Sequence, residues 1–131
     1  MSNYEDKLMF GKVLNDIRCK RGLTFRKMAA ILDFCCAYLC DLEKGNRLPT
    51  LEVIQRLKEK LNITEEEYLK LSDAYALAHS TIPQDVMQYI IDNELISTIR
   101  TLKRVDETGT KTKEFVYTLN KQNKSKNSIN L

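Results

Sequence analysis

The chain has 131 residues, about the length of one ordinary domain; 43% of them are hydrophobic and the net charge is +3. No apolar run approaches the roughly 20 residues of a membrane helix, and no signal-peptide pattern follows the polar N-terminus, so we expect a cytoplasmic protein without a membrane segment. Only 4 Gly and 2 Pro argue against collagen-like chains and turn-rich β architectures.

The first part of the chain is predicted to form a series of helices, because residues that start or end helices occur at intervals along it. A first helix precedes Gly22, and its apolar residues recur at helical spacing: Leu8, Phe10, Leu14 and Ile17. Thr24 predicts the N-cap of a second helix over 25–32. After a short turn, a third helix is expected over 35–44, and Gly45 can adopt the left-handed conformation that ends it.

Two more helices complete a predicted bundle. Thr50 predicts the N-cap of a fourth helix, whose apolar face consists of Leu51, Ile54, Leu57 and Leu61. Thr64 and Glu67 have the spacing of a capping box, which predicts the start of a fifth helix that runs to about Ala78.

Helical periodicity continues beyond Pro83, which suits the first position of a helix. Apolar residues recur to about Arg104, with a break near Asp92. A last short helix is expected over 112–121. The Asn, Ser and Lys residues that dominate from 122 onward predict disorder.

Two short helices joined by a tight turn, 25–32 and 35–44, have the arrangement of a helix-turn-helix, whose second helix lies in the major groove of DNA. Apolar residues on both helices are spaced to pack across the turn: Met28, Ala29, Leu32, Leu39 and Leu42. An ordinary corner between two helices has the same spacing, so spacing alone leaves both interpretations open.

The run over 38–49 reads Tyr-Leu-Cys-Asp-Leu-Glu-Lys-Gly-Asn-Arg-Leu-Pro. Together with Gly11, Arg18 and the sequence Gly-Leu-Thr over 22–24, it closely resembles the Xre/Cro-like helix-turn-helix family of bacterial and phage transcriptional regulators. The resemblance covers residues 8–62. A looser resemblance over 82–102 is to the C-terminal helical extension of one branch of that family.

The resemblance and the sequence pattern together predict an all-α protein in three segments. Residues 6–80 would form a five-helix repressor-type helix-turn-helix bundle. A C-terminal helical extension over 81–121 would follow, as a candidate for dimerisation. A disordered tail over 122–131 would end the chain.

The resemblance also implies site residues. Helix 35–44 corresponds to the recognition helix, and its base-facing residues would be Cys36, Ala37, Cys40 and Asp41. Candidates for phosphate contacts are Thr24, Arg26, Lys27, Tyr38, Lys44 and Arg47, for which a solvated surface is the alternative interpretation. Arg18 and Glu43 lie at positions that the family often joins in a partly buried ion pair of structural role.

The chain departs from the family pattern on the expected reading surface. Family members usually place Gln, Arg, Asn or Ser there and begin the helix with a better cap than Cys35. Phe25 occupies a position where Gln often contacts phosphate. A thiol is a weak donor and Ala can only contact a thymine methyl group, whereas Asp41 could accept from cytosine or repel the duplex. Phosphate contacts must therefore carry much of any affinity.

Four cysteines in a chain without an export signal are expected to be free thiols. We expect no metal and no cofactor, because the usual Cys-x-x-Cys pair is absent and His79 is the single histidine. Cys36 and Cys40 share a helix face. They are either small half-buried residues in place of Ser or Ala, or a redox switch in which a helix N-terminus lowers a thiol pKa.

The sequence therefore predicts a DNA-binding transcriptional regulator, acting as a repressor. Residues 1–50 carry 9 basic against 6 acidic residues and residues 101–131 carry 7 against 3, which suits an anionic partner. We expect a homodimer on a palindromic operator of double-stranded DNA. The alternative is an antitoxin or other protein-interaction module that binds a protein partner through residues 83–121. No motif predicts an enzyme or a catalytic residue.

Overall fold

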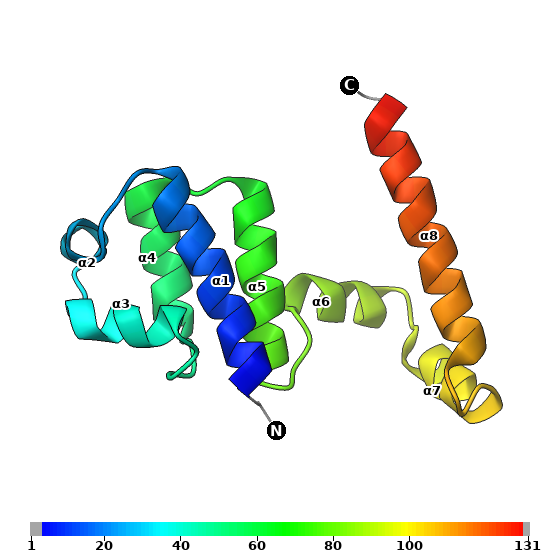
Figure 1. Cartoon of the computed structure of the whole chain (residues 1–131). Coiled ribbons are helices and arrows are strands. Elements are labelled where there is room, and N and C mark those ends of the chain that lie inside the picture. Colours follow the sequence, from blue (N-terminus) through cyan, green and yellow to red (C-terminus); the bar gives the residue numbers. More distant parts are fainter. Residues whose placement is uncertain (1–3, 130–131) are drawn as a thin grey trace. The chain divides into compact units, whose positions relative to one another are not determined.

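The computed structural model describes the backbone of residues 4–129 and the side chains of residues 4–122. These residues form helices and no strand, so the predicted all-α fold is confirmed (Figure 1). The helices are α1 (Tyr4–Lys20), α2 (Phe25–Leu32), α3 (Cys36–Glu43), α4 (Leu51–Leu61), α5 (Glu65–Ala78), α6 (Gln84–Asp92), α7 (Ile96–Val105) and α8 (Thr110–Ile129). Contacts divide the chain into two units, Met1–Val86 and Met87–Leu131, which are described separately.

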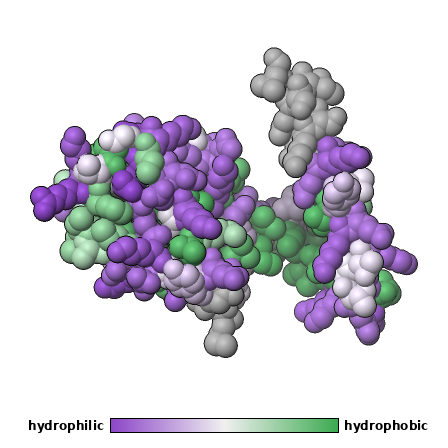
Figure 2. Space-filling view, in the orientation of Figure 1, coloured by the Kyte–Doolittle hydropathy of each residue, from purple (hydrophilic) through white to green (hydrophobic). Residues whose placement is uncertain are grey.

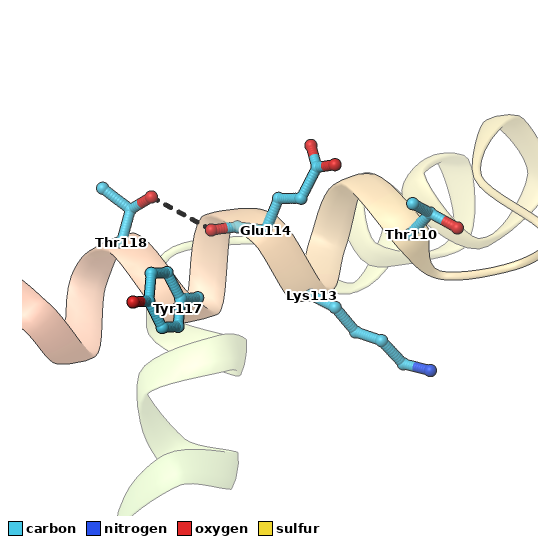
Figure 3. A pocket seen from close by; sticks show the side chains of 5 residues that line it. All are labelled: Thr110, Lys113, Glu114, Tyr117 and Thr118. Atoms are coloured by element: carbon cyan, nitrogen blue, oxygen red, sulfur yellow. Dashed lines mark hydrogen bonds between the residues drawn. The ribbon is translucent and has the colours of Figure 1, made fainter.

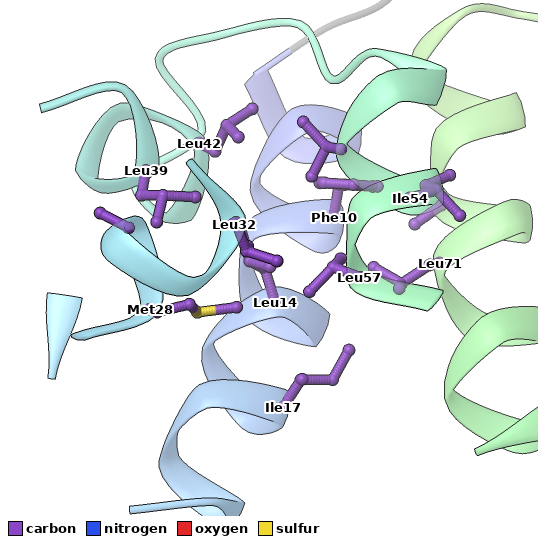
Figure 4. Packing of buried hydrophobic residues seen from close by; sticks show 13 residues of the cluster. Phe10, Leu14, Ile17, Met28, Leu32, Leu39, Leu42, Ile54, Leu57 and Leu71 are labelled. Carbon is purple, nitrogen blue, oxygen red and sulfur yellow. The ribbon is translucent and has the colours of Figure 1, made fainter. Parts of the chain in front are cut away.

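The first unit packs α1 against α3 and α5, α2 against α3 and α4, and α4 against α5. Its core is formed by side chains that all five helices contribute, and Figure 4 shows the larger ones meeting between the helices. The fully buried members include Phe10, Leu14, Met28, Leu32, Leu39, Leu42, Val53, Leu57 and Leu71. The apolar stripes of the sequence thus face one common interior, as amphipathic helices in a bundle do.

Local side-chain chemistry sets two of the predicted helix starts. The Thr24 hydroxyl accepts a hydrogen bond of 3.2 Å from the Lys27 backbone amide, and Thr64 and Glu67 form both halves of the capping box. The prediction for Thr50 is wrong in one respect: its extended backbone occupies the N-cap position of α4, but its side chain makes no capping bond.

The capping carboxylate of α5 has a second role. Glu67 also receives two hydrogen bonds from the Arg21 guanidinium, of 2.8 and 2.9 Å, which join the end of α1 to the start of α5. Hydrogen bonding from Arg21 is the main reason why the pKa of Glu67 falls to about 2. The pair therefore stays ionised at any neutral or mildly acidic pH.

The second unit contains most of α6, then α7 and the 20-residue α8, and no residue of α6 or α7 is buried. The predicted break near Asp92 is present, and Glu94 adopts the left-handed conformation there, with φ 54°. Helix α8 begins at Thr110, where Asp106 accepts bonds from the amide and hydroxyl of Thr112. It includes residues 122–129, for which the sequence predicts disorder; no Gly or Pro interrupts that stretch. Residues 130 and 131 lie outside the described residues.

Among the residues that the structure describes, no helix is both long and apolar enough to cross a membrane.

Candidate nucleic-acid interface

Helices α2 and α3 form the predicted pair of short helices. The turn between them is tight because Asp33 adopts the left-handed conformation, with φ 57°, and the Phe34 amide donates to the Ala29 carbonyl over 2.9 Å. Met28, Ala29 and Leu32 are buried on α2, as are Leu39 and Leu42 on α3. The turn and the packing together fix the angle between the helices, which is the requirement of a helix-turn-helix.

Arg18 connects three segments of this unit. Its Nε donates to Glu43 Oε2 over 2.9 Å and its Nη1 to the Leu23 carbonyl over 2.9 Å, while its guanidinium carbon lies 4.1 Å from the centre of the Phe25 ring. Hydrogen bonding to Glu43 is the main cause that raises the Arg18 pKa. The expected ion pair is therefore present, and it ties α1 to the end of α3 and the start of α2.

The departure at Phe25 has a structural explanation. Its ring stacks on the same guanidinium that binds Glu43, an arrangement in which an aromatic face attracts a cation. An amide side chain at this position has no comparable face. Phe25 thus supports the ion pair, whereas the family pattern places a phosphate contact there.

Three of the four expected base-facing residues, Ala37, Cys40 and Asp41, are not part of the core, whereas Cys36 packs partly against it. Ala37 is exposed, and Cys36, Cys40 and Asp41 are half-buried. Cys35 occupies the N-cap position without a side-chain capping bond, as its poor capping chemistry predicts. The accessible face of this helix is therefore largely apolar.

Basic side chains flank that face at both ends. Arg26 and Lys27 are exposed in the first turn of α2, which contains no acidic residue, and Lys44 is exposed just beyond α3. Backbone amides and the helix dipole make an N-terminus such as that of α2 favourable for a phosphate group. Among the described residues, no ion pair involves Arg26, Lys27 or Lys44.

Arg47 differs from these three because it already has partners. Its Nε lies 3.8 Å from Asp41 Oδ2, and its guanidinium lies 5.4 Å from the centre of the Tyr38 ring. The charge of the Asp41 carboxylate is thereby partly balanced by a nearby cation. This weakens the repulsion between Asp41 and a DNA duplex, which was one of the two possibilities for this residue. Arg47 is 57% exposed and remains accessible to a phosphate.

Sequence reasoning missed Arg56 on α4, which supports the turn. Its Nη1 donates to the Leu32 and Asp33 carbonyls over 3.0 and 2.7 Å, and its guanidinium lies 4.2 Å from the centre of the Phe34 ring. The last carbonyls of α2 are left without helical partners, and a cation is favourable there. The spacing of Glu52 and Arg56 was the only local signal, and it points to a pair within α4 rather than to the turn.

The cysteines are free thiols, as predicted. Burial is the main cause that raises the Cys40 pKa, and the neighbouring Cys36 thiol adds to it. A switch that depends on a lowered pKa is therefore wrong for Cys40, which lies beyond the first turn of α3. The described residues hold no cluster of three or more side chains that could bind a metal ion.

A hollow on the surface of α8 has no features of an active site. It is open to solvent and is lined by residues of that one helix: Thr110, Lys113, Glu114, Tyr117 and Thr118 (Figure 3). The Thr118 hydroxyl donates to the Glu114 carbonyl, and the Lys113 and Glu114 side chains point apart. These groups do not converge on a substrate position.

The supported pair α2 and α3 defines a helix-turn-helix protein. Over 102 residues, the chain is 31% identical to the HTH-type transcriptional regulator DdrOP3 of Deinococcus deserti, and the match spans 73% of this chain and 79% of that protein. The chain therefore belongs to the HTH-type transcriptional regulators. No family model and no solved structure matches it.

Proposed function

We propose that this chain is an Xre/Cro-like repressor that acts in the cytoplasm and docks α3 in the major groove of a palindromic operator. The observation that carries the proposal is the accessible face of α3, held by the Arg18–Glu43 pair and flanked by exposed cations. Arg26, Lys27, Lys44 and Arg47 would contact phosphates, and the Thr24 and Tyr38 hydroxyls would add to these contacts. The proposal includes no catalytic activity.

Replacing Lys44 and Arg47 with alanine should weaken binding to all duplexes to a similar extent. Each phosphate contact releases counterions, so the slope of log K against log salt should become shallower by about 1 per lost contact. Titration of duplex DNA by fluorescence anisotropy at several salt concentrations measures this slope. Lys60→Ala on α4 is the matched control, and it should leave the slope unchanged. An unchanged slope in the double variant would show that neither side chain contacts phosphate.

We further propose that the regulator is a homodimer formed through the second unit. Figure 2 shows hydrophobic surface over α6 and α7. Seven large apolar side chains that these helices contribute to the second unit are more than one third exposed: Met87, Tyr89, Ile91, Ile96, Ile99, Leu102 and Val105. Soluble monomers rarely leave so continuous an apolar surface in water. A second copy would bury it and double the length of DNA that is read.

Sedimentation should show a dimer for the full chain and a monomer for a chain that ends at Ser80. A full-length variant with Ile99→Glu and Leu102→Glu should also be monomeric, because two carboxylates would have to be buried at the contact. Thr101→Glu, on the other side of α7, is the matched control and should stay dimeric. A full chain that remains monomeric at high micromolar concentration would contradict the proposal.

The second candidate function is an antitoxin or another module that binds a protein through residues 83–121. The same exposed apolar side chains favour it, because a foreign protein could cover them as well as a second copy. Selection from a pool of random duplexes separates the two functions. An enriched palindrome supports the repressor, whereas no enrichment at low salt favours the protein-binding module.

A further inference from the structure

The accessible face of α3 offers unusual chemistry for reading DNA. Ala37 is exposed and carries only a methyl group, Cys40 is half-buried, and Cys36 packs partly against the core. Figure 2 shows moderately hydrophobic surface in the region where Figure 1 places α2 and the start of α3. Such groups cannot form the two-bond contacts by which Arg selects guanine and Gln selects adenine.

The polar neighbours of this surface have other partners. The Asp41 carboxylate faces the Arg47 guanidinium, and the same guanidinium lies against the Tyr38 ring. The raised pKa keeps the Cys40 thiol in its neutral form at neutral pH, so it carries no charge that would repel the duplex. Apart from the Asp41–Arg47 pair, the reading surface is therefore apolar and uncharged.

The major groove contains one apolar group, the 5-methyl group of thymine. We propose that Ala37 and Cys40 recognise thymine by contact with its methyl group, so that the part of each half-site beneath α3 is selected for thymine. This inference rests on the proposed docking of α3 in the major groove. A recognition helix without strong hydrogen-bond donors would select this methyl group.

Uracil substitution tests the inference, because deoxyuridine differs from thymidine only by the missing methyl group. The operator is first enriched from random duplexes with the full-length protein, and each thymine of a half-site is then replaced in turn. Each contacted methyl group should contribute about fourfold to affinity, as expected for burial of one such group. Thymines outside the reach of α3 are the internal control and should tolerate uracil.

A variant assigns the contact to a side chain. In Cys40→Ser, a hydroxyl replaces the thiol, and the ratio of affinities for thymine and uracil should fall towards 1 at one position of the half-site only. Cys19→Ser, at an exposed cysteine of α1, is the matched control and should keep every ratio. The uracil series with the unmodified protein needs no variant, so it remains decisive even if Cys40→Ser folds poorly.

The outcomes are distinguishable. An enriched operator that loses affinity at two or more uracil positions supports the inference. An enriched operator that tolerates uracil at every position overturns it and leaves the proposed repressor function in place. Absence of any enriched duplex overturns the repressor function itself.

Discussion

We expect Glu43→Ala to lower the free energy of unfolding by about 3 to 5 kcal/mol, the range for removing one partner of a buried ion pair. The Glu43 side chain is 4% exposed and the Arg18 side chain 14%, so neither charge is well hydrated in the folded chain. The variant leaves the Arg18 guanidinium without its carboxylate. It also deprives the Asn15 amide of an acceptor that now lies 2.8 Å away. Urea denaturation of both proteins measures the difference.

A double-mutant cycle with Arg18→Ala isolates the contribution of the pair itself. The matched control is the cycle for Glu66 and Lys70 on α5, whose side chains are 80% and 62% exposed and lie 3.3 Å apart. The exposed pair should give a coupling energy of about 0.3 to 0.5 kcal/mol, since solvent screens it. A coupling energy near zero for Arg18 and Glu43 would contradict the structural role assigned to them.

Gly11→Ala should be the second strongly destabilising change, although alanine is favoured over glycine within an exposed helix by about 1 kcal/mol. Helix α1 crosses the end of α3 at this glycine. An added methyl carbon would lie 2.6 Å from the Leu42 carbonyl oxygen and still closer to the Glu43 carbonyl oxygen. These are backbone atoms, which cannot turn aside as a flexible side chain can.

We therefore expect a loss of about 3 kcal/mol or more, at the upper end of the range for overpacked sites. Thermal unfolding measures it, and Lys12→Ala on the exposed side of α1 is the control, expected within about 0.5 kcal/mol of the parent. Because α3 must move to admit the methyl group, DNA affinity should fall as well. A Gly11→Ala protein as stable as its parent would show that α1 and α3 can separate at little cost.

Much of the first unit could be predicted from sequence because its signals are local. Thr24 caps α2, and Thr64 with Glu67 caps α5, through contacts between residues three apart in the chain. Apolar residues at helical spacing then face the interior in all five helices. Such features depend on neighbours that are visible in any short window of sequence.

The contacts that support the site could not be predicted from local sequence, because they join residues far apart in the chain. Arg21 and Glu67 are 46 residues apart, and Arg56 reaches the turn from 23 or 24 residues away. Nothing near these residues in the chain indicates which distant carbonyl or carboxylate they meet. The Arg18–Glu43 pair, 25 residues apart, was expected only because the chain resembles a known family.

The support of α3 by Arg18 also bears on the geometry of the reading surface. With 8 residues, α3 is shorter than the roughly 12 to 15 residues at which an isolated helix becomes even marginally stable in water. It stays helical because Arg18, Leu14 and the rest of the bundle pack against it. The geometry of the reading surface therefore depends on the bundle that supports α3, and not on any helical stability of α3 by itself.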